Sequence, residues 1–318
     1  MKSLKPSSSG KLIMSQPNPR ELKELYLQGQ NIMALLRKNA TTNGNTEEII
    51  EVSYDLQAGS YVSALSEPSI AEHKQNYGAA IAQEMLTRCH PTSILEAGVG
   101  EATTLAEVVK NLPSETKAYG FDLCWSRLAY GKLWLDKNKI ADTTLCTGSL
   151  FQIPFSTNSI DVVYTSHSIE PNGGFEQPIL QELYRVAKKY LILLEPGYEL
   201  ASAAAKARMD SHRYCKNLVK TAENLGYSVI KHELFPLTAN PLNPTAITVI
   251  QKTPISESEK DVESVLACPK TGATLQQFGE VLFSPEALCV YPIISGIPCL
   301  RAENAIVASY YPELSDLP

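Results

Sequence analysis

Residues 94–104 read Ile-Leu-Glu-Ala-Gly-Val-Gly-Glu-Ala-Thr-Thr, and this stretch decides the fold. An apolar strand runs into a Gly-x-Gly turn, and a helix follows. Glycines at such a turn let the backbone approach a ligand, while the start of the helix presents unpaired N–H groups. The next strand ends at Asp122, whose carboxylate can accept hydrogen bonds from ribose hydroxyls. The pattern predicts a nucleotide-binding turn, and a tight strand–helix turn without a ligand is the plainer alternative.

Outward from this turn, strands and helices alternate. The expected strands are residues 93–97, 117–121, 143–147, 160–165, 189–195, 227–234 and 244–252. The expected helices are residues 102–111, 125–138, 177–187 and 202–225. Such alternation predicts an α/β fold with a doubly wound, mostly parallel seven-stranded sheet and helices on both faces. The last two strands follow each other closely, so they are expected to form an antiparallel hairpin at one edge.

The chain before the sheet consists of an expected leader and expected helices. Residues 1–19 predict a flexible leader, and because no apolar run follows its lysines, it is not a signal peptide. Apolar residues at helical spacing predict helices over residues 20–38 and 70–89. Residues 20–74 are therefore interpreted as a helical lid or entry segment, and residues 75–253 as the core domain.

Length and composition suggest about two domains and exclude several classes of protein. The chain has 318 residues and a net charge of −6, and residues 254–318 hold nine acidic and three basic residues, so the remainder is balanced. No basic stripe is present, which argues against nucleic acid as a partner. The apolar runs are shorter than the about 20 residues of a membrane span. Seven widely spaced cysteines without a Cys-x-x-Cys pair suit a cytoplasmic location.

Two further segments extend the pattern of the glycine turn. Residues 147–155 read Thr-Gly-Ser-Leu-Phe-Gln-Ile-Pro-Phe, and residues 158–170 read Asn-Ser-Ile-Asp-Val-Val-Tyr-Thr-Ser-His-Ser-Ile-Glu. In order and spacing, these segments, the glycine turn and Asp122 resemble the class I S-adenosylmethionine-dependent methyltransferases over roughly residues 75–195. A nicotinamide-binding alternative fits less well, because its third glycine would be needed at Thr103.

The resemblance implies S-adenosyl-L-methionine as the cofactor and assigns residues to it. Gly98 and Gly100 would form the cofactor turn, and Asp122 would hold the ribose. The full implied set is Tyr61, Glu96, Gly98, Gly100, Asp122, Leu123, Ser149, Leu150 and Ser166. Ser149 departs from the family, whose members often have an aspartate there facing the adenine amino group.

The candidates for catalysis lie at or after the carboxyl ends of strands. Methyl transfer to oxygen or nitrogen needs closely positioned reactants and can need a base. His167 follows the fourth strand, and its ordinary pKa near neutrality suits a general base. Glu195 ends the fifth strand, and His212 lies on the following helix. We expect His167, Glu195 or His212 to handle the acceptor. A structural role is the alternative for His167 and Glu195, and a solvated helix face is the alternative for His212.

The C-terminal part predicts a separate unit. Residues 254–264 are expected to be a linker, and residues 265–318 a small α+β module. Its segments Cys-Pro-Lys-Thr-Gly-Ala-Thr-Leu, at 268–275, and Tyr-Pro-Ile-Ile-Ser-Gly-Ile-Pro-Cys-Leu, at 291–300, resemble the Trm112-like domains, which bind and activate methyltransferases. The resemblance implies that the module docks on the catalytic domain. Thr271 stands where zinc-binding members have a second cysteine, so no metal is expected.

Taken together, these patterns predict a methyltransferase of a small-molecule acceptor, such as a sugar or another biosynthetic intermediate, by O- or N-methylation. The Trm112-like resemblance keeps RNA or a translation protein open as the acceptor. A scaffold that binds S-adenosylmethionine without turnover is the alternative from another functional class. Whether the chain forms a homodimer is also left open.

Overall fold

The computed structural model describes residues 18–39, 44–140, 142–253 and 264–314. Most of the expected leader, residues 1–17, and most of the expected linker, residues 254–263, lie outside this part of the chain. No helix in the described residues is long and apolar enough to cross a membrane. The described chain forms two sheets, a large one of seven strands and a small one of five.

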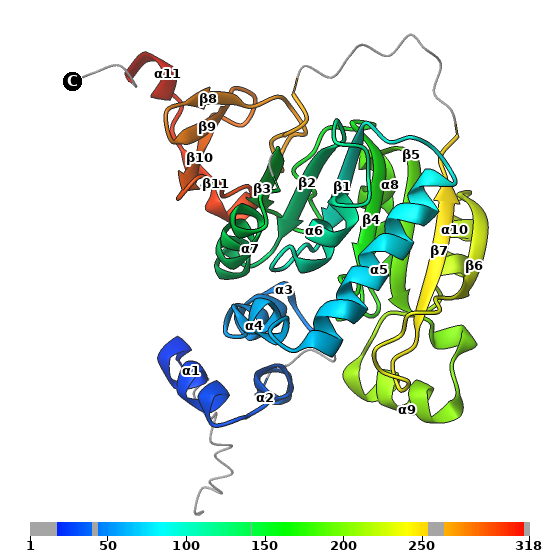
Figure 1. Ribbon diagram of the computed structural model, residues 1–318. Helices are drawn as coiled ribbons and strands as arrows, with labels where there is room; N and C mark the ends of the chain where they lie inside the picture. Colours follow the sequence, from blue (N-terminus) through cyan, green and yellow to red (C-terminus); the bar gives the residue numbers. More distant parts are fainter. Residues whose placement is uncertain (1–17, 40–43, 141, 254–263, 315–318) are drawn as a thin grey trace, which may run out of the picture.

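The large sheet has the strand order β3-β2-β1-β4-β5-β7-β6 (Figure 1). Strands β1 to β5 run parallel, and β7 pairs antiparallel with both β5 and β6. The predicted parallel sheet and its antiparallel edge hairpin are thus confirmed. The strands are β1 Ser93–Ala97, β2 Lys117–Asp122, β3 Thr143–Thr147, β4 Ile160–Ser166, β5 Ala187–Pro196, β6 Ser228–Leu234 and β7 Thr245–Gln251.

Helices cover both faces of this sheet, as the doubly wound architecture requires. Helices α5, α6 and α7 pack on one face, and α8 and α10 on the other. Because both faces are covered, the central strand β4 is buried along residues 160–165. The helices are α5 Pro68–Leu86, α6 Thr103–Val109, α7 Trp125–Lys137, α8 Glu176–Val186 and α10 Leu218–Asn224.

The N-terminal helices differ from the prediction. The single helix expected over residues 20–38 is wrong, because Gly29 has a positive φ of 80° that ends α1. Four short helices instead lie below the carboxyl ends of β1 and β2 in Figure 1. They are α1 Pro19–Leu27, α2 Ile32–Asn39, α3 Glu47–Asp55 and α4 Ser60–Ala64.

The long helix expected over residues 202–225 is also wrong. It is divided into α9, Ala203–His212, and α10, because Arg213 and Asn217 adopt left-handed φ angles of 61° and 57°. Tertiary hydrogen bonds stabilise the break between the two helices. The Cys215 N–H donates to the Glu170 carbonyl, and the Lys216 N–H donates to the Glu176 carboxylate. A short 3₁₀ helix, η1 Tyr198–Leu200, precedes α9.

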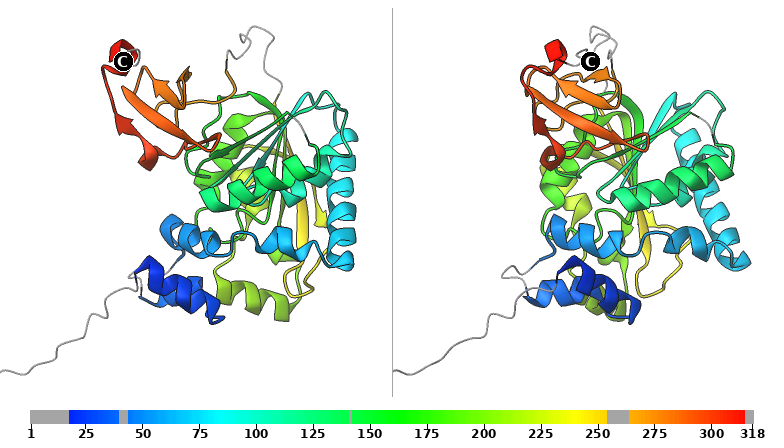
Figure 2. Two further views of the ribbon diagram at one scale, coloured as in Figure 1. Left: turned by 60° about the vertical axis from the view of Figure 1, so that its left-hand side comes forward. Right: turned by 90° about the vertical axis from the view of Figure 1, so that its left-hand side faces the viewer.

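The C-terminal module forms the small antiparallel sheet and lies against the β3 edge of the large one (Figures 1 and 2). Cys299 makes a parallel bridge to Thr147, and the Ala267 N–H donates to the Pro154 carbonyl. Buried side chains of the module join the core that covers the α8 face. Its elements are β8 Gln276–Phe278, β9 Val281–Ser284, β10 Cys289–Ile294, β11 Ile297–Pro298, η2 Ala302–Asn304, β12 Ile306–Val307 and α11 Tyr311–Leu314.

Candidate active site

A cavity of about 330 Å³ lies at the carboxyl ends of β1, β2 and β4, and residues of α3 and α4 line it from the opposite side. Ligands of open α/β sheets bind at this edge. Several of the predicted residues line the cavity, namely Tyr61, Glu96, Gly98, Asp122, Leu123, Leu150, Ser166 and His167. Gly100 and Ser149 contact lining residues without lining the cavity themselves.

The glycine turn and Asp122 are joined by hydrogen bonds. Gly98 and Gly100 have positive φ angles of 78° and 54°, which glycine adopts without steric cost. The Asp122 carboxylate accepts the Gly100 N–H at 2.8 Å and the Cys124 N–H at 2.9 Å, and it is buried at the cavity wall. The turn and the acid therefore form one rigid unit.

Glu96 and Lys74 bring opposite charges to the cavity next to this turn. Glu96 is buried and accepts the Tyr164 hydroxyl at 2.9 Å, and burial raises the pKa of its carboxyl to about 8. The Lys74 ammonium donates to the Thr104 hydroxyl at 3.0 Å, and burial lowers its pKa. Both side chains line the cavity, so a polar ligand would meet an acid and a cation there.

Glu101 and Arg127 fix the short helices over the cavity, and the sequence reading missed both. The Glu101 carboxylate accepts the N–H groups of Gly59 at 2.9 Å and Val62 at 2.7 Å, at the start of α4. The Arg127 guanidinium lies 4.8 Å from the Tyr61 ring centre and 5.1 Å from that of Tyr54. Since Glu101 follows the glycine turn directly, the turn and the helices above it are linked.

Ser149 also contacts these helices. Its hydroxyl donates to a carboxylate oxygen of Glu47 at 2.5 Å and accepts the Phe151 N–H at 3.0 Å. Glu47 starts α3 and lines the cavity, and burial raises the pKa of its carboxyl. Glu47 is a third site residue that the sequence reading missed.

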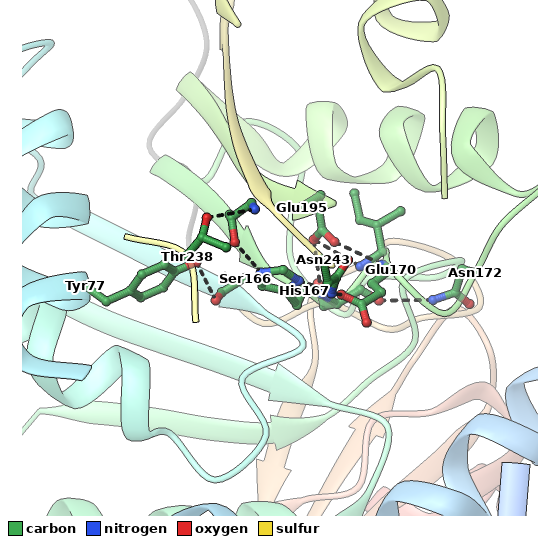
Figure 3. A network of polar contacts seen from close by, with 11 residues as sticks. Tyr77, Ser166, His167, Glu170, Asn172, Glu195, Thr238 and Asn243 are labelled. Carbon is green, nitrogen blue, oxygen red and sulfur yellow. Dashed lines mark hydrogen bonds and ion pairs between the residues drawn. The ribbon is translucent and has the colours of Figure 1, made fainter. Parts of the chain in front are cut away.

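His167 and Glu170 form a close pair in the wall of the cavity (Figure 3). The distance from His167 Nδ1 to Glu170 Oε2 is 2.5 Å, and His167 Nε2 lies 2.9 Å from the Thr245 hydroxyl. The same Glu170 oxygen accepts the Asn243 amide at 3.0 Å. Burial lowers the pKa of His167, but the hydrogen bond and charge of Glu170 outweigh it and raise that pKa. Burial raises the pKa of Glu170, and the contact with His167 outweighs it and lowers that pKa.

Two predicted catalytic residues do not line the cavity. Glu195 is buried, and its carboxylate accepts three N–H groups, from Ser168 at 3.1 Å, Ile169 at 3.1 Å and Glu170 at 3.0 Å (Figure 3). Its oxygens are thus committed to the loop after β4 instead of an acceptor. His212 ends α9, where its Nδ1 lies 2.9 Å from the Arg208 carbonyl oxygen. Within the described residues, no group of three or more His, Cys, Asp and Glu side chains could hold a metal.

Comparison with known proteins supports a methyltransferase domain. Residues 94–190 match the family model Methyltransf_25, described as a methyltransferase domain. No curated protein is similar enough in sequence to count as a relative.

Two solved structures share the fold. One is magnesium protoporphyrin IX methyltransferase from Synechocystis with bound SAH, at 12% identity and a TM-score of 0.52, covering 65% of this chain and 100% of the other. The second is a candidate O-methyltransferase from Nostoc punctiforme, at 14% identity and a TM-score of 0.50, covering 73% and 68%. The domain match and the fold together identify residues 94–190 as the methyltransferase domain of an S-adenosylmethionine-dependent enzyme with a Rossmann-like core.

Proposed function

We propose that the enzyme methylates an oxygen or nitrogen atom of a small molecule, such as a sugar or another biosynthetic intermediate. The observation that carries this proposal is the group of polar side chains of His167, Glu170, Asn172 and Asn243, which line the cavity together with residues of α3 and α4. The paired imidazole and carboxylate suit an acceptor that must lose a proton.

The residues present fit the cofactor. A Cβ at Gly98 would lie 2.2 Å from Ser168 Cβ, so this turn brings bare backbone to the cavity. Asp122 would accept the ribose hydroxyls, and Lys74 with Thr104 would hold a carboxylate at the other side of the turn. S-adenosylmethionine supplies a methyl group activated by a sulfonium.

His167 would take the proton that the acceptor loses. In the structure Nδ1 pairs with Glu170 and Nε2 with the Thr245 hydroxyl, which is buried in β7 and does not line the cavity. The imidazole would therefore have to turn away from Thr245 to present the lone pair of Nε2 to an acceptor. An acceptor hydroxyl or amine in the cavity would then pass its proton to Nε2 as its oxygen or nitrogen bonds to the methyl carbon, whose bond to the sulfonium sulfur breaks. Glu170 would stabilise the resulting imidazolium.

Replacing Asp122 by alanine is expected to weaken cofactor binding by about 10- to 100-fold, the usual cost of a lost charge-assisted pair of hydrogen bonds. Calorimetry with S-adenosylhomocysteine measures the change. Asp136→Ala, at an exposed position of α7, is the matched control and should bind normally. Unchanged binding in Asp122→Ala would refute the assigned cofactor site.

The pH dependence of turnover is expected to follow the His167 imidazole. Because Glu170 raises its pKa above the ordinary 6.5, turnover should increase with pH along a limb centred above that value. Glu170→Gln removes the charge, so the pKa of His167 should fall and the limb should move to lower pH. Glu223→Gln, exposed on α10, is the control. NMR titration of the His167 ring measures the same shift directly, and an unshifted titration in Glu170→Gln contradicts the assigned pair.

The C-terminal module is proposed to be Trm112-like, on the strength of its two motifs and of its contact with the β3 edge. This resemblance favours RNA or a translation protein as the alternative acceptor, and a scaffold without turnover is the remaining alternative. Incubation with S-adenosylmethionine labelled in its methyl group, and either a small-molecule extract or bulk RNA, separates them. Label in the small molecules supports the proposal, and label in RNA overturns it. Cofactor binding without label anywhere supports the scaffold.

A further inference from the structure

Helix α3 places the carboxylate of Glu47 next to Ser149, whose own side chain carries only a hydroxyl. Glu47 Oε1 accepts the Ser149 hydroxyl, and no hydrogen bond to Glu47 Oε2 is found within the part of the chain that the structure describes. The side chain lines the cavity. A carboxylate has about four acceptor positions, so Glu47 retains acceptor capacity for an N–H donor of a ligand.

The surroundings of Glu47 indicate what that donor belongs to. Three apolar residues near Glu47 line the cavity. Ile50 lies three residues after Glu47, and Leu150 and Phe151 directly follow Ser149, the hydrogen-bond partner of Glu47. The charged and amide side chains of Lys74, His167 and Asn243, in contrast, come from other elements. A flat base needs apolar side chains along its faces and a polar group at its edge. The apolar residues near Glu47 can supply the first, and the Glu47 carboxylate the second.

We propose that Glu47 is the residue that selects adenine, by accepting a hydrogen bond from its exocyclic amino group, and that Arg301 of the C-terminal module holds Glu47 in place. This inference rests on the proposed cofactor site. The contact with the adenine amino group would then come from helix α3 instead of the loop after β3. Selection of the cofactor would therefore depend on how α3 is held in place.

The anchoring comes from Glu51, one helical turn after Glu47. Residues four apart share a helix face, and the Glu51 carboxylate pairs with the Arg301 guanidinium at 2.5 Å. Arg301 is mostly buried, with 12% of its side chain exposed, so this pair is better shielded from solvent than an ordinary surface pair. On the core side, the Cys124 thiol donates to the Glu51 carbonyl at 3.3 Å. The module and the core therefore hold α3 at the same residue.

The first test measures selectivity for the amino group. Calorimetry compares S-adenosylhomocysteine with its analogue in which hydrogen replaces the 6-amino group. Wild type should prefer the natural ligand by about tenfold or more, as sites built around a ligand donor do. Glu47→Ala should bring this ratio close to one, and Glu48→Ala, exposed on the same helix, should keep the wild-type ratio. A wild-type ratio in folded Glu47→Ala overturns the proposal.

The second test addresses Arg301. Arg301→Met should weaken S-adenosylhomocysteine binding severalfold. Adding Glu51→Gln to this variant should weaken binding no further, because both substitutions break the same ion pair. Lys270→Met, exposed in the module, is the control. Equal binding by Arg301→Met and wild type overturns the role of the module. If Asp122→Ala also binds S-adenosylhomocysteine normally, the cofactor site itself is wrong. If Asp122→Ala binds weakly and the Glu47 and Arg301 variants bind like wild type, the cofactor site stands and only this inference fails.

Discussion

Gly98→Ala is expected to abolish measurable cofactor binding while leaving most of the fold in place. At a φ of 78° an alanine is strained, and its Cβ would lie 2.2 Å from Ser168 Cβ, far inside van der Waals contact. Ser168 cannot shift freely, because its N–H is bonded to the buried Glu195. The turn itself must move instead, at a cost of about 2–4 kcal/mol, which is about 30- to 1000-fold in affinity.

A matched control separates the clash from the backbone strain. Gly29 has nearly the same φ, 80°, but a Cβ there would meet nothing within 4 Å. Gly29→Ala should therefore show the cost of the φ angle alone, with normal binding of S-adenosylhomocysteine by calorimetry. Thermal melting of both variants reports the change in fold stability. If Gly98→Ala binds the cofactor as Gly29→Ala does, the turn is not the cofactor contact.

The sheet could be predicted from the sequence because its signals are local. Several strands contain a short apolar run, and residues 191–194 of β5 show this most clearly. The glycine turn could be predicted for the same reason, since Gly98 and Asp122 are read from single strand ends. The closeness of the last two strands was enough to predict their antiparallel pairing.

The broken helices could not be predicted, because their ends depend on distant partners. Residues 202–225 contain only weak helix breakers, and the break at Cys215 exists because its N–H donates to the Glu170 carbonyl. Tertiary hydrogen bonds of this kind override local helix propensity. Gly29 was a visible signal for the other break, and the prediction gave it too little weight.

The contacts over the cavity were missed for a related reason. Glu47 lies about one hundred residues from Ser149, and Glu101 about forty from Gly59. No spacing rule connects residues so far apart. The carboxylate of Glu101 next to the glycine turn was the one visible signal, because a carboxylate is costly to bury unless it is paired or used. Glu195 was noticed on that argument, but its partners proved to be backbone N–H groups.

Glu195→Ala is expected to lower the free energy of unfolding by about 3 kcal/mol or more, because it leaves three N–H groups of the loop without their acceptor. That loop carries His167, whose left-handed φ of 57° is itself strained and needs support. Turnover should therefore be lost even in the fraction that remains folded. Urea unfolding and turnover measure the two effects, and Glu223→Ala is the exposed control.

Glu195→Gln separates positioning of the loop from contact with the acceptor. The amide oxygen can still accept the N–H groups of Ser168 and Ile169, but the amide nitrogen would face the Glu170 N–H, donor against donor. Stability should fall by less than in Glu195→Ala. Because the Glu195 charge also raises the pKa of His167, the acid limb of turnover should move to lower pH. A positioning role predicts both changes together. If Glu195→Gln lost turnover at full stability and with an unmoved limb, Glu195 would instead contact the acceptor, and the loop assignment would be wrong.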